Sequence, residues 1–87
     1  MSITVELFGI PRQRAGVAQV EVDGVRLDEI LAALVARFPR LADECIADDR
    51  LQAGYLANLN GRRFVSDPDT LLQPGDALLI LSADAGG

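Results

Sequence analysis

The end of the chain constrains the fold more than any other stretch. Residues 77–81 form an unbroken apolar run of strand length, and the turn residues Pro74-Gly75 precede it. Such a run is typical of a strand that is buried on both faces in the middle of a sheet. The composition then changes abruptly to the small and polar residues 82–87, none of which can anchor a core. We therefore expect a folded domain over residues 1–81 and a flexible tail over residues 82–87.

The expected tail offers one chemical group, the carboxylate of Gly87. Gly86 and Gly87 have no Cβ, so together with Ala85 they are slim enough to thread a narrow channel. Six residues at about 3.3 Å each give an extended reach of roughly 20 Å, which would carry the carboxylate into a partner's active site. A frayed terminus without a role is the alternative. The turn and strand directly before the tail favour the functional interpretation.

Two strands and one helix are predicted from the first part of the chain. Residues 3–7 and 18–22 alternate apolar with polar side chains, which indicates an antiparallel hairpin joined by a long loop over residues 8–16. The next apolar side chains recur at helical spacing and form a single stripe that Pro39 ends. They are Leu27, Ile30, Leu31, Leu34, Val35 and Phe38.

The second half of the chain is predicted to contain three more strand segments, the last of which is the apolar run over residues 77–81. Residues 40–54 are compatible with a short helix that places Leu41, Cys45 and Ile46 inward and the neighbouring acids toward water. Residues 55–60 read as a strand, Asn60-Gly61 as a tight turn, and residues 62–65 as a charged edge segment.

The order of these elements predicts an α+β domain. One main helix packs across one face of a mixed four- to five-stranded sheet, and the first and last strands lie side by side in parallel. This is the β-grasp, or ubiquitin-like, arrangement, with the tail extending from the last strand. The pattern alone leaves it as one topology among several.

Composition excludes several classes of function. Thirteen acidic residues against eight arginines give a net charge of −5, which disfavours nucleic acid and favours a partner with a basic face. The absence of lysine argues against a modifier that forms chains on itself. The longest apolar run is too short to cross a membrane, no signal peptide is visible, and one cysteine is compatible with a reducing compartment. We expect a cytoplasmic protein.

No catalytic or metal-binding constellation is apparent. The chain has no histidine, and the acidic neighbours of Cys45 would raise the pKa of its thiol, so it is a poor nucleophile. The acids Asp43, Glu44, Asp48 and Asp49 match no calcium-loop spacing and are better explained as a solvated surface. We therefore expect a protein that binds no cofactor and is not an enzyme on its own.

Three stretches carry a resemblance to a known family. Residues 3–16 resemble the opening strand and loop of the small subunit of molybdopterin synthase, and residues 56–61 resemble its third strand and turn. Residues 72–76, followed by an apolar strand and Gly86-Gly87, are similar to its ending. The resemblance covers essentially the whole chain and points to the MoaD/ThiS ubiquitin-like sulfur carriers.

The resemblance implies a mechanism and a set of partners. An adenylyltransferase of the ubiquitin-activating type would use ATP to adenylate the Gly87 carboxylate, and a persulfide sulfur would displace AMP to leave a thiocarboxylate. A larger synthase subunit, of the molybdopterin synthase type, would take up Gly86 and Ala85 with the rest of the tail and accept the sulfur. Phe8, Arg12 and Leu81 match the family's partner surface, although Phe8 could be core and Arg12 merely solvated.

Departures from the family pattern leave alternatives open. The molybdopterin subunit usually has aromatic residues and prolines before its tail, whereas this chain has Ile80-Leu81 and then residues 82–85. A carrier that serves thiamine, cysteine or another sulfur metabolite is therefore an alternative. A modifier attached to other proteins through Gly87 and a β-grasp interaction module that carries no sulfur are two more.

Overall fold

The structure is a computed structural model that describes residues 2–86. Its strands and helices follow one another along the chain in the order β1 (Ser2–Phe8), α1 (Ile10–Ala15), β2 (Gln19–Asp23), α2 (Leu27–Arg37), η1 (Pro39–Asp43), β3 (Ile46–Ala47), β4 (Arg50–Leu51), β5 (Tyr55–Leu59), β6 (Arg63–Val65), β7 (Ala77–Ser82) and η2 (Ala83–Gly86). The elements labelled η are short 3-10 helices.

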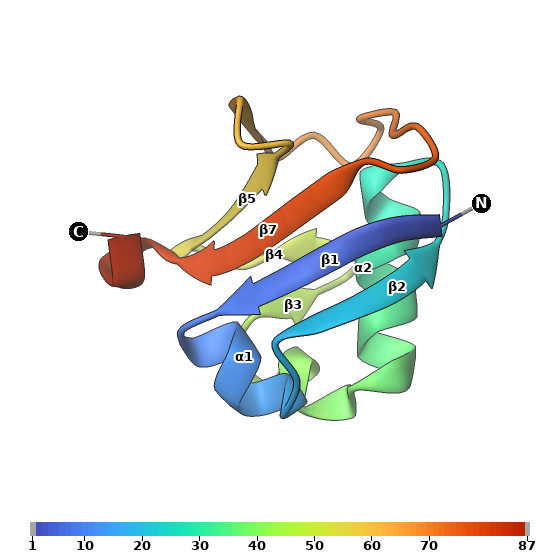
Figure 1. Ribbon diagram of the computed structural model, residues 1–87. Helices are drawn as coiled ribbons and strands as arrows, with labels where there is room; N and C mark the ends of the chain where they lie inside the picture. The colour runs from blue at the N-terminus through green and yellow to red at the C-terminus, as the bar shows by residue number, and fades with distance from the viewer. Residues whose placement is uncertain (1, 87) are drawn as a thin grey trace.

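A mixed sheet with the strand order β2-β1-β7-β5-β6 forms the centre of the molecule. β1 and β7 run parallel through its middle, with Val5 opposite Leu78, and every other neighbouring pair in this sheet is antiparallel. α2 lies behind the sheet in the view of Figure 1. This is the predicted β-grasp arrangement, which is therefore confirmed with five strands.

The core lies between the sheet and α2. Alternate residues of β1 point toward the helix, namely Ile3, Val5 and Leu7, and all three are buried. Leu78 and Ile80 do the same from β7. The helix contributes the predicted stripe, of which Leu27, Ile30, Leu31 and Leu34 are fully buried and Val35 and Phe38 are partly buried. Burial of each such side chain stabilises the fold by roughly 1.5–3 kcal/mol.

The prediction that the last strand is buried on both faces is wrong. Leu78 and Ile80 are buried, but Leu79 and Leu81 on the opposite face are only half-buried. The physical reason is that one helical layer covers only one face of a sheet, so a central strand keeps an open side. An unbroken apolar run therefore indicates a central strand, but it does not indicate whether helices cover one face of that strand or both.

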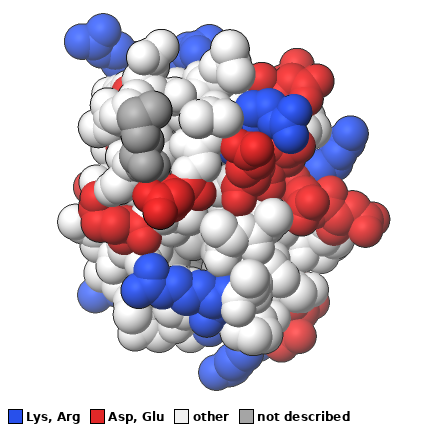
Figure 2. Space-filling view, turned by 90° about the vertical axis from the view of Figure 1, so that its right-hand side faces the viewer, with Lys and Arg blue, Asp and Glu red and all other residues white. Residues whose placement is uncertain are grey.

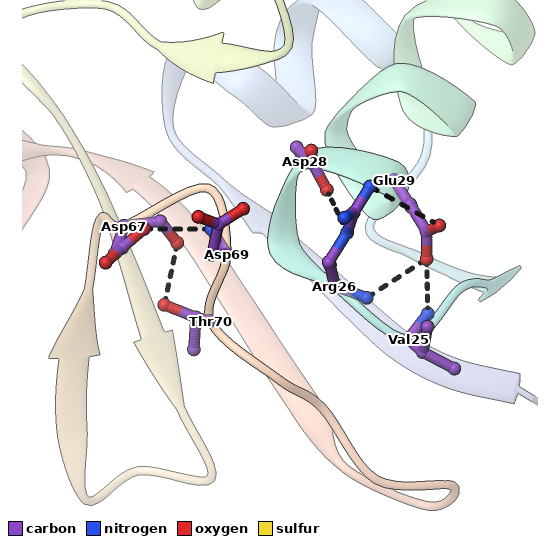
Figure 3. Close-up of polar contacts among 7 residues, drawn as sticks. All are labelled: Val25, Arg26, Asp28, Glu29, Asp67, Asp69 and Thr70. Carbon is purple, nitrogen blue, oxygen red and sulfur yellow. Dashed lines mark hydrogen bonds and ion pairs between the residues drawn. The ribbon is translucent and has the colours of Figure 1, made fainter.

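The start of α2 is stabilised without a Ser or Thr cap. The Glu29 carboxylate accepts hydrogen bonds from the backbone N–H groups of Val25 and Arg26, at 2.9 and 3.1 Å. These bonds lower the pKa of Glu29. Arg26 also forms ion pairs with Asp28 and Glu29, so the helix start is held by its own side chains (Figure 3).

The loop between β6 and β7 supplies the remaining cap. The carbonyl oxygens of Pro68 and Thr70 accept hydrogen bonds from the N–H groups of Asp28 and Leu27, at 3.1 and 3.0 Å. The loop is itself a turn in which the Thr70 N–H donates to the Asp67 carbonyl oxygen, and the Thr70 hydroxyl donates to the same oxygen (Figure 3). The loop over residues 67–70, which is distant in sequence, therefore satisfies the first backbone N–H groups of α2, and Glu29 satisfies the N–H groups directly before the helix.

The expected loop over residues 8–16 contains a helix, α1. Gly9 enters it at φ 70°, Pro11 lies in its first turn, and Gly16 ends it at φ 81° with its N–H bonded to the Arg12 carbonyl oxygen. The same glycines and proline that interrupt a strand pattern are the residues that begin and end a short helix. The prediction of a loop was wrong for this reason.

Residues 40–54 form a 3-10 turn and a small hairpin, not the expected short helix. β3 and β4 pair antiparallel, and Asp48 and Asp49 make the turn between them at φ 53° and 59°. Leu41, Cys45 and Ile46 are buried as predicted. The inward-facing set was therefore correct, but its spacing did not distinguish a helix from an irregular segment with the same residues inside.

The last described residues differ from the expected extended tail. Residues 83–86 turn into the short helix η2, seen at the red end of Figure 1. The N–H of Ala83 donates to the carbonyl oxygen of Gly54 at 2.7 Å, which holds the first residue of this turn against the start of β5. Among the described residues, no helix is long and apolar enough to cross a membrane.

Candidate functional site

A row of apolar side chains crosses the uncovered face of the sheet at its tail end. The strand register places Phe8 of β1 beside Leu81 of β7, and Leu81 beside Leu56 of β5. Phe8 is 48% exposed and Leu56 is 37% exposed, although both occupy strands of a small sheet. We call these three residues the apolar row. It directly precedes Ser82, where the tail begins.

Two further side chains continue this surface on the same face. Leu79 lies two residues before Leu81, and Phe64 on the edge strand β6 lies opposite Asn58. Phe64 is 63% exposed, more than any other aromatic side chain of the described chain. Contiguous exposed apolar surface beside a functional segment is typical of a protein interaction site. The uncovered face therefore offers a docking surface at the base of the tail.

The structure brings together two of the predicted interface residues and leaves the third apart. Phe8 and Leu81 are register partners. Arg12 is exposed on α1, where it lines a depression with Gly9 and Gln13 and forms no ion pair with another described residue. The predicted Phe8–Leu81 surface therefore gains a geometric basis, whereas Arg12 is not a strand-register partner of either residue.

The predicted tail residues lie at the limit of the described chain. The backbone of Ala85 and Gly86 belongs to η2. Gly87, the predicted site of adenylation, lies outside the described residues. What the structure does describe is the base of the tail, where Ser82 is buried and pairs with Tyr55 across β7 and β5.

A polar cluster at the base of the tail was missed in the sequence. The Glu44 carboxylate accepts a hydrogen bond from the Tyr55 hydroxyl, and its other oxygen lies 2.8 Å from an Arg14 guanidinium nitrogen. The two donors, that of Tyr55 foremost, lower the pKa of Glu44, and the same bond raises the pKa of Tyr55. The cluster ties α1, the segment after η1 and β5 together.

Glu44 was expected to face water with the neighbouring acids. Its side chain does stay partly exposed, but its carboxylate is also bound by two partners from segments that are distant in sequence. The only tyrosine of the chain, next to a glycine before a strand, was the one available signal. Glu44, Tyr55 and Ser82 also line a depression of about 340 Å³ beside the first tail residues.

Cys45 is a structural residue. Its side chain is fully buried, and burial raises the pKa of the thiol, with the Glu44 charge adding to the effect. A thiol in this setting is protonated and enclosed, so it is a poor nucleophile. The expectation of a buried or half-buried structural cysteine is confirmed.

The charged surface is mixed but mainly acidic. Figure 2 shows acidic side chains gathered in a band across one side of the molecule, with basic side chains scattered around it. Within residues 2–86, no group of three acidic, cysteine or histidine side chains is arranged to hold a metal ion.

Comparison with known proteins identifies the family. The model of the ThiS family matches residues 5–87, which is almost the whole chain. No curated protein sequence matches the chain. The crystal structure of SAMP1 from Haloferax volcanii is similar over 100% of both chains, with 25% identity and a TM-score of 0.82.

Two further solved structures extend the comparison. In the BexX/CysO complex from Amycolatopsis orientalis, the matching chain is 26% identical over 98% of this chain and 99% of that chain, with a TM-score of 0.80. A putative molybdopterin converting factor subunit 1 from Pyrococcus furiosus is 25% identical over 94% and 97%, with a TM-score of 0.77. This chain therefore belongs to the ThiS family of ubiquitin-like sulfur carriers and modifiers.

Proposed function

We propose that this protein is a sulfur carrier whose Gly87 carboxylate is adenylated and converted to a thiocarboxylate. The observation that carries the proposal is the position of the tail. In the sequence, Gly86 and Gly87 come within five residues of the end of the central strand β7, and the apolar row lies where that strand ends. A partner that binds the row is thus placed beside the segment that leads to the carboxylate.

The chemistry requires outside enzymes because a carboxylate is a poor electrophile. An adenylyltransferase of the ubiquitin-activating type joins the Gly87 carboxylate to the α-phosphate of ATP and releases pyrophosphate. The acyl carbon then carries AMP as a leaving group, and the outer sulfur of a persulfide donor displaces AMP to form an acyl disulfide. A second thiol of the donor system cleaves the S–S bond of this acyl disulfide, which releases the Gly87 thiocarboxylate and leaves a disulfide on the donor. The carrier contributes no catalytic group to these steps and is a co-substrate, in agreement with its lack of histidine and its enclosed Cys45.

We further propose that the acceptor is a larger synthase subunit of the molybdopterin synthase type. The similarity to the molybdopterin converting factor subunit from Pyrococcus furiosus supports this assignment. The CysO chain in complex with BexX is equally similar, so a synthase of another sulfur metabolite is the alternative acceptor. In either case Phe8, Leu56 and Leu81 form the surface that docks on the acceptor.

The first test is the intact mass of the protein after incubation with a ubiquitin-activating-type adenylyltransferase, ATP and a persulfide donor. We expect a mass increase equal to the exchange of one oxygen for one sulfur. A variant that lacks only Gly87 controls for sulfur bound elsewhere and should keep the original mass and the same thermal unfolding. A mass that never changes with any activating enzyme, while the protein is folded, would contradict the proposal.

The second test separates the acceptors. The thiocarboxylated protein is mixed with the molybdopterin synthase large subunit and its precursor, or with a BexX-type synthase and its substrate. We expect sulfur to leave Gly87 with the molybdopterin subunit, followed by return of the original mass. Transfer only to the BexX-type synthase would overturn the assignment of the pathway while keeping the carrier chemistry.

A protein modifier is a second candidate, favoured by the similarity to SAMP1 over the whole of both chains. A modifier forms an amide bond between Gly87 and a lysine of another protein after the same adenylation. Conjugates of higher mass that survive thiol reductants, and that disappear in the variant lacking Gly87, would support this candidate over the carrier.

A further inference from the structure

A second row of side chains crosses the uncovered face next to the apolar row. The strand register aligns residues from all five strands, and each of them alternates with a buried neighbour that packs toward α2. In order from β2 to β6 they are Gln19, Glu6, Leu79, Asn58 and Phe64. We call this set the mixed row. It lies two residues along each strand from the apolar row, which is about 7 Å farther from the tail.

Two polar groups of the mixed row lack partners. Glu6 is exposed and forms no hydrogen bond or ion pair with another residue of the described chain. The Oδ1 atom of Asn58 is closed off from solvent and accepts no hydrogen bond within residues 2–86. A buried acceptor left in this state destabilises the fold, and a donor from a partner would remove that penalty.

These two groups flank one apolar side chain and one hollow. Leu79 lies between Glu6 and Asn58 in the register. The three residues line the same depression, of about 380 Å³, on the uncovered face. The hollow therefore has an apolar floor at Leu79 and hydrogen-bond acceptors on both sides.

Polar side chains elsewhere on the uncovered face do have hydrogen-bond partners. In the next row away from the tail, the Glu21 carboxylate accepts hydrogen bonds from the hydroxyls of Ser2 and Thr4, at 2.7 and 2.6 Å. These bonds lower the pKa of Glu21. Asn60 is likewise engaged, since it donates to Asp76 and accepts from the Ala77 N–H. Beside Leu79, Glu6 and Asn58 are acceptors that the donors of this surface leave unused within the described chain.

We propose that this hollow binds the guanidinium of an arginine carried by the protein that docks on the apolar row. The Glu6 carboxylate accepts two N–H groups of the guanidinium, and the Asn58 carboxamide, after rotation about its Cβ–Cγ bond, accepts a third. The arginine stem lies over Leu79. A guanidinium fits better than an ammonium, since it is planar, weakly hydrated and carries several donors in a fixed geometry.

The functional consequence is orientation. The apolar row alone could bind a partner in more than one direction, because apolar contacts are not directional. A charged contact about 7 Å away on the side opposite the tail fixes which end of the partner faces Gly87. This consequence rests on the proposed carrier function, whereas the guanidinium site itself does not.

The site is tested first without any partner protein. Isotopically labelled protein is titrated with ethylguanidinium chloride and, separately, with ethylammonium chloride at equal ionic strength, and the Asn58 side-chain amide and Leu79 methyl resonances are followed. We expect saturable shifts with ethylguanidinium that are at least several-fold weaker with ethylammonium. They should disappear in Glu6→Gln and persist in Asp69→Asn, which removes one exposed acid elsewhere. Shifts that do not saturate, or that survive in Glu6→Gln, would overturn the proposal.

The orienting role is tested with the acceptor that receives sulfur. Glu6→Arg should raise the KM of the acceptor for the thiocarboxylated carrier at least tenfold, with little change in kcat at saturation, whereas Asp69→Arg should leave both near their original values. An unchanged KM for Glu6→Arg, or an equal rise for Asp69→Arg, would overturn the role. If no thiocarboxylate forms, the proposed function fails, and the ethylguanidinium titration still decides the site.

Discussion

The two faces of the sheet differ although the same strands build both. β7 directs Leu78 and Ile80 toward α2, where both are buried, and directs Leu79 and Leu81 to the other side, where they are half-buried. Leu78 and Leu79 are the same residue type, one position apart, yet they lie in different environments. The covered face supplies stability through burial, and the uncovered face keeps apolar area free for a partner.

The comparison also explains why the apolar residues of the uncovered face are not a folding defect. They gather at one end, beside the tail, in the row of Phe8, Leu81 and Leu56. At the opposite end the same face carries Ser2, Thr4 and Glu21, which bond to one another. The uncovered face thus changes from apolar near the tail to polar at the opposite end. A surface of this kind can distinguish the two orientations of a bound partner.

The sharpest test of this comparison is a pair of neighbouring leucines. Leu78→Ala should lower the free energy of unfolding by about 2–5 kcal/mol, because it leaves a cavity under α2. Leu79→Ala should cost about 1 kcal/mol or less, because its side chain already contacts solvent. Urea denaturation of both variants provides the measurement. Equal losses would show that the uncovered face is part of the core.

Substitutions on the uncovered face should have the opposite profile: a large effect on binding to the acceptor and a small effect on stability. Phe8→Ser and Leu81→Ser should each slow sulfur transfer to the acceptor by roughly 30-fold or more, which corresponds to a loss of about 2 kcal/mol at an interface anchor. Thermal unfolding should change little, since both side chains are partly exposed. Single-turnover transfer from preformed thiocarboxylate measures the effect. Transfer at the original rate by both variants would exclude the apolar row as the docking surface.

A glycine on the covered side offers a third test. A Cβ at Gly24 would lie 2.8 Å from Ile30 Cδ1 and 3.3 Å from Glu29 Cβ, and Ile30 is fully buried. Gly24→Ala should therefore cost roughly 1–3 kcal/mol through overpacking. The control is Gly61→Ala, which meets no atom within 4 Å and is penalised only by its φ of 70°. Equal stability of Gly24→Ala and the wild type would contradict the close packing.

The smallest expected effect concerns the cluster at the base of the tail. The Tyr55 and Arg14 hydrogen bonds hold the pKa of Glu44 below its usual value of 4.5. Their contribution to stability is therefore present above the unfolded-state pKa and is lost as the pH falls through the lower folded-state pKa. Tyr55→Phe weakens this effect, so its destabilisation should be larger at pH 7 than in acid.

Thermal unfolding of Tyr55→Phe and wild type across the acid range measures the difference. Phe64→Leu, which changes an exposed aromatic side chain that makes no hydrogen bond to a carboxylate within residues 2–86, serves as the control and should show a shift that does not depend on pH. A Tyr55→Phe shift that is the same at neutral and acid pH would mean that the Glu44 bond adds nothing to folding.

Much of the architecture could be predicted from the sequence. The alternation of residues 3–7, the helical stripe that starts at Leu27 and the Asn60-Gly61 turn gave the correct elements, because each is a local pattern with a single physical cause. The prediction was wrong for the loop over residues 8–16, and it left the structure of residues 40–54 open. There the signals of a turn and of a short helix are the same residues, and contacts with the rest of the fold decide between them.

The candidate site was predicted only in part. Phe8 and Leu81 were identified, but Leu56, Leu79 and Phe64 were read simply as strand residues. The Arg14–Glu44–Tyr55 cluster was not foreseen, since no local pattern links three residues from three segments. Arg12 was named because it matches the family's partner surface. It lies exposed on α1, and its place in an interface stays a prediction.

The sequence by itself determined the periodicity of the main strands and of α2, and it placed a Gly-Gly pair shortly after the last strand. Those features depend on residue type and spacing. The expected pairing of the first and last strands left their register open. Only the tertiary structure decided that register, and therefore that Phe8 meets Leu81 and that Glu6, Leu79 and Asn58 share a hollow. Strand register depends on pairing between opposite ends of the chain, and local sequence does not specify that pairing.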